Sequence, residues 1–202
     1  NRVVPRFLFR CRRFIVFEAA PQEQWSGEVV VVSWTTTEEE LVAAERLTGA
    51  LRSQIGCPVR AAIARDNHKI VGGLWCCESK FEEADLGVTI QLADNQCWLF
   101  SGYVDRDYRQ RGVYSQLVSF VIHHQGSRQC LLAINPDNRR SMQAHRRLGI
   151  SPLGRVVCAR FLTAVWCRAS GDITANSRWT NNSRKRPLTL LVHRGDESRD
   201  AV

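Results

Sequence analysis

Short apolar segments separated by polar turns run along most of the chain, and this alternation predicts a series of β-strands. Residues 66–69 have the composition of a tight turn, so the apolar segments on either side are expected to form a hairpin. Asp94 and Asn95 predict a second turn. The segments expected to form strands in the first half of the chain are residues 14–17, 28–34, 61–64, 70–77, 86–92 and 97–104.

Three segments have the apolar spacing that is typical of a helix. The first follows Thr37, which is expected to cap it, with Glu40 completing a capping box. The second follows the last of the strands above and is expected to end at Gly126. Asn138 is a suitable N-cap for the third helix, which is expected to stop at Gly149.

The remaining third of the chain predicts further strands. Residues 130–134 and 154–167 are apolar, whereas residues 172–185 are polar and are expected to form a loop. Residues 187–193 begin with Pro and predict a strand at the edge of a sheet. The tail from Arg194 onward is expected to be disordered.

The order of these elements predicts an α/β fold with a mixed, mostly antiparallel central sheet and flanking helices. Residues 97–104, the second helix and residues 130–134 form a βαβ crossover, which places the two strands parallel. We expect one domain at residues 28–167. A basic N-terminal extension with one strand (1–27) precedes it, and a polar C-terminal segment with an edge strand and a tail (168–202) follows it.

Composition narrows the class of protein. The 202 residues suit one domain with short extensions, and no apolar run approaches the ~20 residues of a membrane span. Eight cysteines are scattered through apolar segments, with no C-x-x-C pair and no spacing typical of a metal site. We interpret them as buried, reduced thiols of a cytoplasmic protein and expect no metal.

The net charge of +8 is concentrated at the two ends of the chain. Residues 1–17 carry five arginines and no acidic residue, and residues 155–202 carry nine basic and four acidic residues. The segment between them carries 14 basic and 16 acidic residues, which argues against a specific nucleic-acid-binding domain. We favour solvated basic termini, with weak contact to an anionic surface as the alternative.

The start of the second helix has an unusual composition. Arg109 and Arg111 precede Gly112, and no Ser, Thr, Asp or Asn stands just before the helix to cap it. The first N–H groups of a helix have no partner within the helix. We therefore expect an external anion to complete this cap.

Two motifs surround the βαβ unit. They read Val104-x-x-x-x-Arg109-x-x-Gly112-x-Tyr114 and Asn138-x-x-Ser141-x-x-x-His145-x-x-Leu148-Gly149-Ile150. Together they resemble the acetyl-CoA-binding core of the GNAT acyltransferase superfamily, with a clear match over residues 97–156. The resemblance implies the acyltransferase fold of that superfamily, in which the two parallel strands splay apart and the pantetheine arm of acetyl-CoA enters between them.

The resemblance also implies an activity, namely acetyl transfer from acetyl-CoA to a primary amine of a small molecule or peptide. The anion at the helix start is then the pyrophosphate of coenzyme A, and the N–H of Val104 polarises the thioester. The residues expected to bind the cofactor are Tyr103, Val104, Arg109, Gln110, Arg111, Gly112, Val113, Tyr114, Ser115, Asn138 and Ser141. The chain is expected to act as a monomer or a homodimer.

Three departures from the family pattern leave alternatives open. Tyr114 replaces a small residue, and residues 97–104 contain no carboxylate to act as general base. His145 stands where relatives carry a tyrosine thought to protonate the leaving thiolate, and it is either that acid or a packing residue. A water relay to Glu82, Glu83 or Asp105 is one hypothesis for the base. A non-catalytic coenzyme A-binding domain is the alternative function.

Overall fold

The computed structural model describes residues 9–19, 30–52, 58–83, 86–146, 148, 150–181 and 188–193. The described strands are β1 (Phe9–Ala19), β2 (Val31–Trp34), β3 (Val59–Asp66), β4 (Lys69–Cys77), β5 (Lys80–Glu83), β6 (Val88–Gln91), β7 (Gln96–Val104), β8 (Gln129–Ile134), β9 (Ser151–Phe161), β10 (Ala164–Gly171), β11 (Ile173–Ala175), β12 (Trp179–Thr180) and β13 (Leu188–Val192). The helices are α1 (Glu38–Thr48), α2 (Val113–Gln125) and α3 (Arg139–Arg146), with a short 3₁₀ turn, η2 (Arg106–Tyr108).

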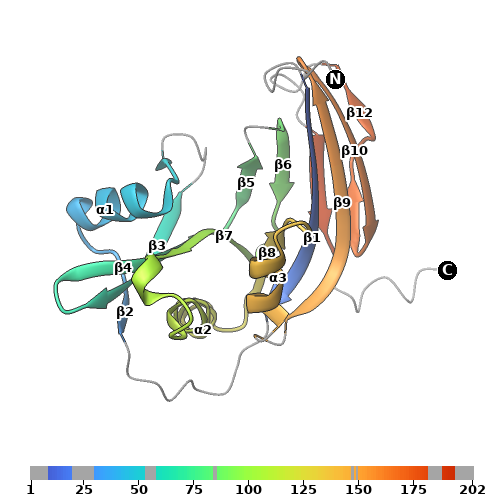
Figure 1. Ribbon diagram of the computed structural model, residues 1–202. Helices are drawn as coiled ribbons and strands as arrows, with labels where there is room; N and C mark the ends of the chain where they lie inside the picture. The colour runs from blue at the N-terminus through green and yellow to red at the C-terminus, as the bar shows by residue number, and fades with distance from the viewer. Residues whose placement is uncertain are drawn as a thin grey trace.

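Nine strands form one twisted sheet in the order β12-β10-β9-β1-β8-β7-β4-β3-β2 (Figure 1). A second sheet, in the order β11-β13-β6-β5, packs beside it. The main sheet contains one parallel pair, β7 with β8, and its other pairs are antiparallel. The predicted fold class is therefore confirmed.

The parallel pair splays apart, as the family resemblance implies. Gln96–Leu99 pairs with residues 129–132, and within the described chain this pairing stops there. Beyond Leu99, β7 continues along β4 as far as Val104, while β8 continues along β1. A bulge at Ser101, whose φ is 47°, bends β7 at this point. We use "the splay" for residues 100–104 of β7 facing residues 133–134 of β8.

The N-terminal strand is longer than predicted and lies inside the sheet. β1 pairs with β8 on one side and with β9 on the other. Val16 and Phe17 are buried, so both faces of the strand contribute to the core. Arginines at positions 10, 12 and 13 interrupt the apolar pattern, and for this reason only residues 14–17 were expected to be a strand.

Helices cover the two faces of the sheet around β3 and β4. α1 packs on Ala61, Ile63 and Trp75, whereas α2 packs on the opposite face, over Ala62 and Leu74. The predicted capping box at the start of α1 is confirmed, because the Thr37 and Glu40 side chains each bond the other residue's backbone N–H. The second sheet packs under β7, on the face opposite α2.

The C-terminal part differs from the expectation in three places. The apolar run at 154–167 is two strands, β9 and β10, joined by a turn at Leu162 and Thr163. The segment expected to be a loop contains β11 and β12. The predicted strand near the C-terminus is confirmed as β13, but its expected edge position is wrong, because it pairs on both sides, with β11 and β6. None of the described helices has the length and apolar character needed to cross a bilayer.

The cysteines also differ from the expectation. Cys158 and Cys167 lie directly opposite each other on β9 and β10 and form a disulfide. The prediction that all the thiols are reduced is therefore wrong for this pair. The cytoplasmic location, which rested on that prediction, stays a prediction.

Candidate functional site

The start of α2 lies at the end of β7, beside the splay. Gly112 is the N-cap residue in a left-handed conformation, with φ 79°, and no side chain caps the helix. The first helical hydrogen bond runs from Gln116 N–H to the Gly112 carbonyl, at 3.0 Å. The amides before Gln116 therefore lack helical partners and point out of the helix end. The predicted uncapped helix start is confirmed, and it has the geometry of an anion site.

The two arginines of this loop stack on tyrosines. The Arg109 guanidinium lies 5.3 Å from the centre of the Tyr103 ring, and its Nε donates to the Val104 carbonyl at 3.0 Å. The Arg111 guanidinium lies 5.3 Å from the centre of the Tyr108 ring. These contacts hold two positive charges beside the helix start, where they favour an anion further.

A polar network fixes the loop to the β3–β4 hairpin. Lys69 Nζ lies 2.9 Å from the Asp105 carboxylate, and Tyr108 Oη donates to Asp66 at 2.7 Å. The hydrogen bond from Lys69 lowers the pKa of Asp105 below its usual value, and the same contact raises the pKa of Lys69. Sequence patterns indicated the hairpin but not this network, which depends on the packing of distant segments.

The backbone of Val104 faces the splay. Asp105 N–H donates to the Val71 carbonyl in β4 at 2.8 Å. Because successive N–H groups of a strand point to opposite edges, the Val104 N–H points away from β4. It thus lies on the edge of β7 that β8 has left, which is the edge predicted to hold the thioester.

Asn138 starts the third helix, as expected. Its Oδ1 accepts a hydrogen bond from Ser141 N–H at 3.1 Å, in the position of an N-cap. Arg139 and Arg140 follow at the exposed start of α3. Contact of Asn138 or Ser141 with a cofactor stays a prediction.

Tyr114 and His145, the two departures from the family pattern, contact each other. Tyr114 Oη lies 2.8 Å from His145 Nε2, and His145 Nδ1 lies 2.7 Å from the Ser141 carbonyl. A carbonyl only accepts, so Nδ1 carries the proton and Nε2 accepts from the tyrosine hydroxyl. A Cβ placed on Gly102 would lie 2.6 Å from Cε2 of Tyr114. The Tyr114 ring therefore packs over β7, and its hydroxyl reaches α3, the helix that follows β8.

Burial favours the neutral form of both groups. It lowers the pKa of His145, although the bond to Ser141 acts in the opposite direction. It raises the pKa of the Tyr114 hydroxyl. With His145 neutral and Nε2 accepting, the proton in this pair belongs to the tyrosine. The role of His145 as an acid stays a prediction.

The carboxylates named as candidate bases lie on different sides of the splay. Glu82 belongs to β5 and lies 2.6 Å from Lys80. The neighbouring Phe81 packs on Phe100 of β7, with ring centres 4.9 Å apart, so β5 lies beside the start of the splay. Asp105 is held by Lys69 on the β4 side. Among the described residues, neither Glu82 nor Asp105 is in contact with His145.

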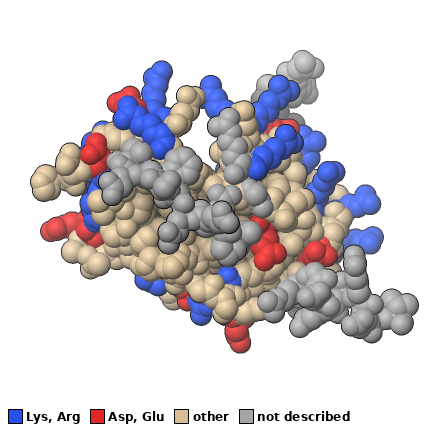
Figure 2. Space-filling view, turned by 90° about the horizontal axis from the view of Figure 1, so that it is seen from below, with Lys and Arg blue, Asp and Glu red and all other residues tan. Residues whose placement is uncertain are grey.

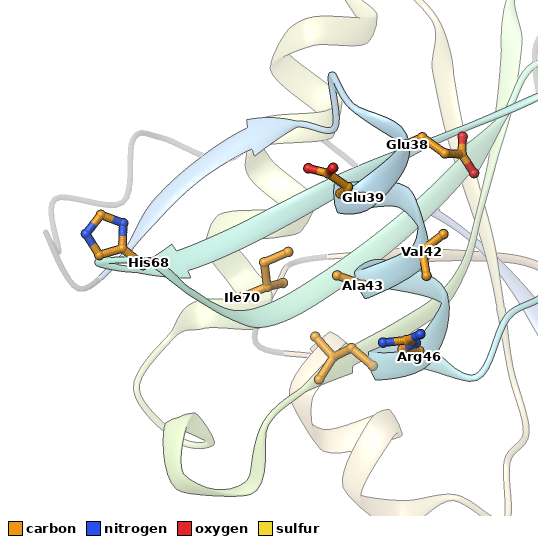
Figure 3. Close-up of a pocket in the computed structure, with 8 residues that line it drawn as sticks. Glu38, Glu39, Val42, Ala43, Arg46, His68 and Ile70 are labelled. Carbon is orange, nitrogen blue, oxygen red and sulfur yellow. The ribbon is translucent and has the colours of Figure 1, made fainter.

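A separate open groove of about 740 Å³ lies between α1 and the β3–β4 hairpin (Figure 3). Its lining residues are Glu38, Glu39, Val42, Ala43, Arg46, Leu47, His68 and Ile70. None of them is among the residues predicted to bind acetyl-CoA, so this groove is distinct from the site at α2.

Coenzyme A requires an anion site for its pyrophosphate and an unpaired strand edge for its pantetheine amides. The amides from Gly112 onward fit the first requirement, and the splayed edge of β7 fits the second. The ring of Tyr114 lies over Gly102 of β7, and its hydroxyl reaches His145 of α3. We expect the arm of the cofactor to pass beside this ring.

A splayed parallel pair with an uncapped helix start at its mouth defines a class of acyl-CoA-dependent transferases. Residues 19–150 match the model of the Acetyltransferase (GNAT) family, and this match covers more than half of the chain. The chain belongs to the GNAT acetyltransferase family, whose members transfer acyl groups from acetyl-CoA.

Solved structures show the same fold at low sequence identity. A conserved protein of unknown function from Staphylococcus epidermidis is 14% identical with a TM-score of 0.56, over 75% of this chain and 61% of that one. A putative GNAT acetyltransferase from Novosphingobium aromaticivorans is 14% identical with a TM-score of 0.53, over 74% and 63%. A GCN5-related N-acetyltransferase from Kribbella flavida has the same identity and TM-score, over 75% and 59%.

The matched region thus spans about three fifths of these neighbours. No curated protein matches the chain significantly.

Proposed function

We propose that the chain transfers an acetyl group from acetyl-CoA to a primary amine, by direct attack in a complex that holds both reactants. The observation that carries this proposal is the uncapped start of α2 beside the splay of β7 and β8. A phosphate-binding helix end and an open strand edge stand next to each other, which suits the two ends of the cofactor arm.

The chain's own groups contribute mainly by orientation and by polarisation. Both reactants held in one site react with far less loss of entropy than in solution. The Val104 N–H donates to the thioester carbonyl and stabilises negative charge on its oxygen as the amine attacks. A water-linked carboxylate, Asp105 or Glu82 or Glu83, accepts the proton of the amine. Acetyl-CoA supplies the acyl group, and the thiolate that leaves is protonated at the Tyr114–His145 pair.

One observation favours a second function, a coenzyme A-binding domain without catalysis. Asp105, one of the candidate bases, is held in an ion pair with Lys69. Such a domain would bind the pyrophosphate at Gly112 but would not place the thioester against an amine.

The test separates binding from turnover. Isothermal calorimetry with acetyl-CoA is expected to show binding, and saturating cofactor is expected to raise the melting temperature because it binds the folded state only. Release of free thiol with a panel of amines then decides between the two functions. Binding without thiol release supports the non-catalytic domain, and no binding at millimolar coenzyme A removes both.

A further inference from the structure

The two basic ends of the sequence meet in one part of the fold. β1 pairs with β9, and β9 pairs with β10, so residues from both ends of the chain form adjacent strands. The strands β1, β9 and β10 together contain six arginines and one acidic residue, Glu18, which lies at the end of β1 far from Phe9. Figure 2 shows Lys and Arg side chains projecting along this side of the molecule. Among the described residues, the arginines of β1, β9 and β10 thus form one basic region in space.

The end of these strands at the turn between β9 and β10 is apolar. Phe9 lies directly opposite Phe161, and Leu162 follows in the turn that joins β9 to β10. Their exposed fractions are 46%, 55% and 50%. We call these three residues the tip. The end of the sheet that bears the tip extends away from the three α-helices (Figure 1).

On the sheet face that bears the tip, the type of side chain changes from row to row with distance from the tip. Trp166 and Trp179 lie opposite each other, one row behind the tip, and are 37% and 51% exposed. The next row holds Arg168 and Arg13, with Val157 between them, and Arg155 lies in the row after that. Arg13 also contacts Asp137, at 3.0 Å. From the tip inward, this face therefore carries phenylalanine and leucine, then tryptophan, then arginine.

The turn itself points to a role for Leu162. Phe161 pairs with Ala164, so Leu162 and Thr163 form a two-residue hairpin loop. Leu162 has φ 53°, the left-handed conformation that glycine and asparagine adopt readily and leucine rarely does. Folding of the hairpin alone favours glycine there. The turn itself therefore does not account for an exposed leucine at this position.

We propose that this end of the sheet docks on a bilayer surface that contains anionic phospholipids. Rows of one face are two residues apart, about 7 Å, so the rows from the tip to Arg168 cover about 14 Å and Arg155 lies one row further. Interfacial protein segments bury apolar groups about 5–10 Å into the boundary of headgroups and acyl chains. At that depth the tip reaches the acyl chains, the tryptophans lie at the interface that they prefer, and the arginines meet the phosphates.

Other occupants match the face less well. A second copy of the chain would bring two basic faces together, which like charge opposes. A single-stranded nucleic acid could stack on the tryptophans and bind the arginines. It would gain nothing from an apolar tip on a protruding turn, which is the feature that a bilayer explains.

The experiment is cosedimentation of the chain with phosphatidylcholine vesicles that contain or lack phosphatidylserine. Binding is expected only with phosphatidylserine and is expected to fall as salt rises. Leu162→Gly should weaken it about tenfold because the main apolar contact of the turn is lost. Arg155→Gln and Arg168→Gln should each weaken it about fivefold. The matched controls, Leu191→Ser in β13 and Arg46→Gln in α1, are exposed elsewhere and should bind as the parent does.

Two further measurements show whether a loss of vesicle binding comes from unfolding or from a change at the acetyl-CoA site. Leu162→Gly should keep or raise the melting temperature, because glycine suits the left-handed turn, and it should bind acetyl-CoA as the parent does. If it unfolds the chain, the two arginine variants decide, since they change exposed side chains only. No binding to anionic vesicles at low salt overturns the proposal, and so does binding that the tip and arginine variants leave unchanged. Binding of a single-stranded oligonucleotide without vesicle binding also overturns it.

Discussion

At the scale of single residues, this site departs from the family pattern in which of its two helices carries the tyrosine. The family pattern has a small residue on the phosphate-binding helix and a tyrosine on the next helix. Here the tyrosine is Tyr114, on the first of these helices, and the second carries His145. The hydroxyl still lies between the two helices, because Tyr114 Oη reaches His145 Nε2. The identity of the two residues was evident from the motifs, but their contact was not, since it depends on how α2 and α3 pack.

The pair predicts how stability depends on pH. Burial lowers the pKa of His145 below its usual value of about 6.5, so the unfolded chain takes up this proton at a higher pH than the folded chain. The stability that the neutral imidazole contributes is complete above about pH 6.5 and is lost as the pH falls below it. Protonation also removes the lone pair that accepts the Tyr114 hydroxyl.

The measurement is the melting temperature of the parent and of His145→Gln from about pH 7 to about pH 5. The parent should lose more than the variant, which keeps an acceptor and does not titrate. In a chain of this size a loss of about 1 kcal/mol lowers the melting temperature by about 2–4 °C. Parallel profiles for the two proteins would contradict the burial of a neutral imidazole at this position. Tyr114→Phe serves as the control that removes the hydrogen bond but leaves His145 in place.

At the scale of elements, local signals predicted the pieces that hold the site and missed those defined by distant pairing. α2 begins at Val113 and is closed by Gly126, and α3 follows its Asn138 cap, as the sequence indicated. β5, β11 and β12 were missed, because they are short and owe their conformation to the strands beside them. The ion pair of Lys69 and Asp105 could not be predicted either, because it depends on the packing of two segments that are distant in the sequence.

The start of α2 carries the prediction for cofactor binding. Gly112→Asp places a carboxylate where the pyrophosphate is expected, and it also forces a side chain onto a left-handed residue with φ 79°. Charge repulsion should remove measurable binding of coenzyme A. Gly112→Asn is the matched control, because asparagine tolerates the left-handed conformation and has no charge. Calorimetry should rank the parent above Gly112→Asn, with Gly112→Asp last. Equal affinities for the two variants would show that no phosphate lies there.

At the scale of the whole molecule, the position of β1 bears on how the chain is organised. Residues 1–27 were expected to be an extension outside the domain, because the order of predicted strands and helices placed the domain at residues 28–167. β1 nevertheless lies between β8 and β9, and it connects the half of the sheet that holds the site to the half that holds the tip. The composition and order of segments along the sequence do not show which strands pair with one another.

We therefore expect β1 to unfold together with the rest of the chain. Val16 is 1% exposed and packs with Trp98 and Leu131 in the core shared with the second sheet. Val16→Ala should lower the free energy of unfolding by about 2 kcal/mol, through lost burial and the cavity left behind. Cys11→Ser changes an exposed position on the same strand and should stay within about 0.5 kcal/mol of the parent. Urea unfolding followed by tryptophan fluorescence and by circular dichroism should give one transition for both variants, shifted only for Val16→Ala. An unshifted main transition in Val16→Ala would mean that β1 is an extension after all, and that the sheet on the acetyl-CoA side is stable without it.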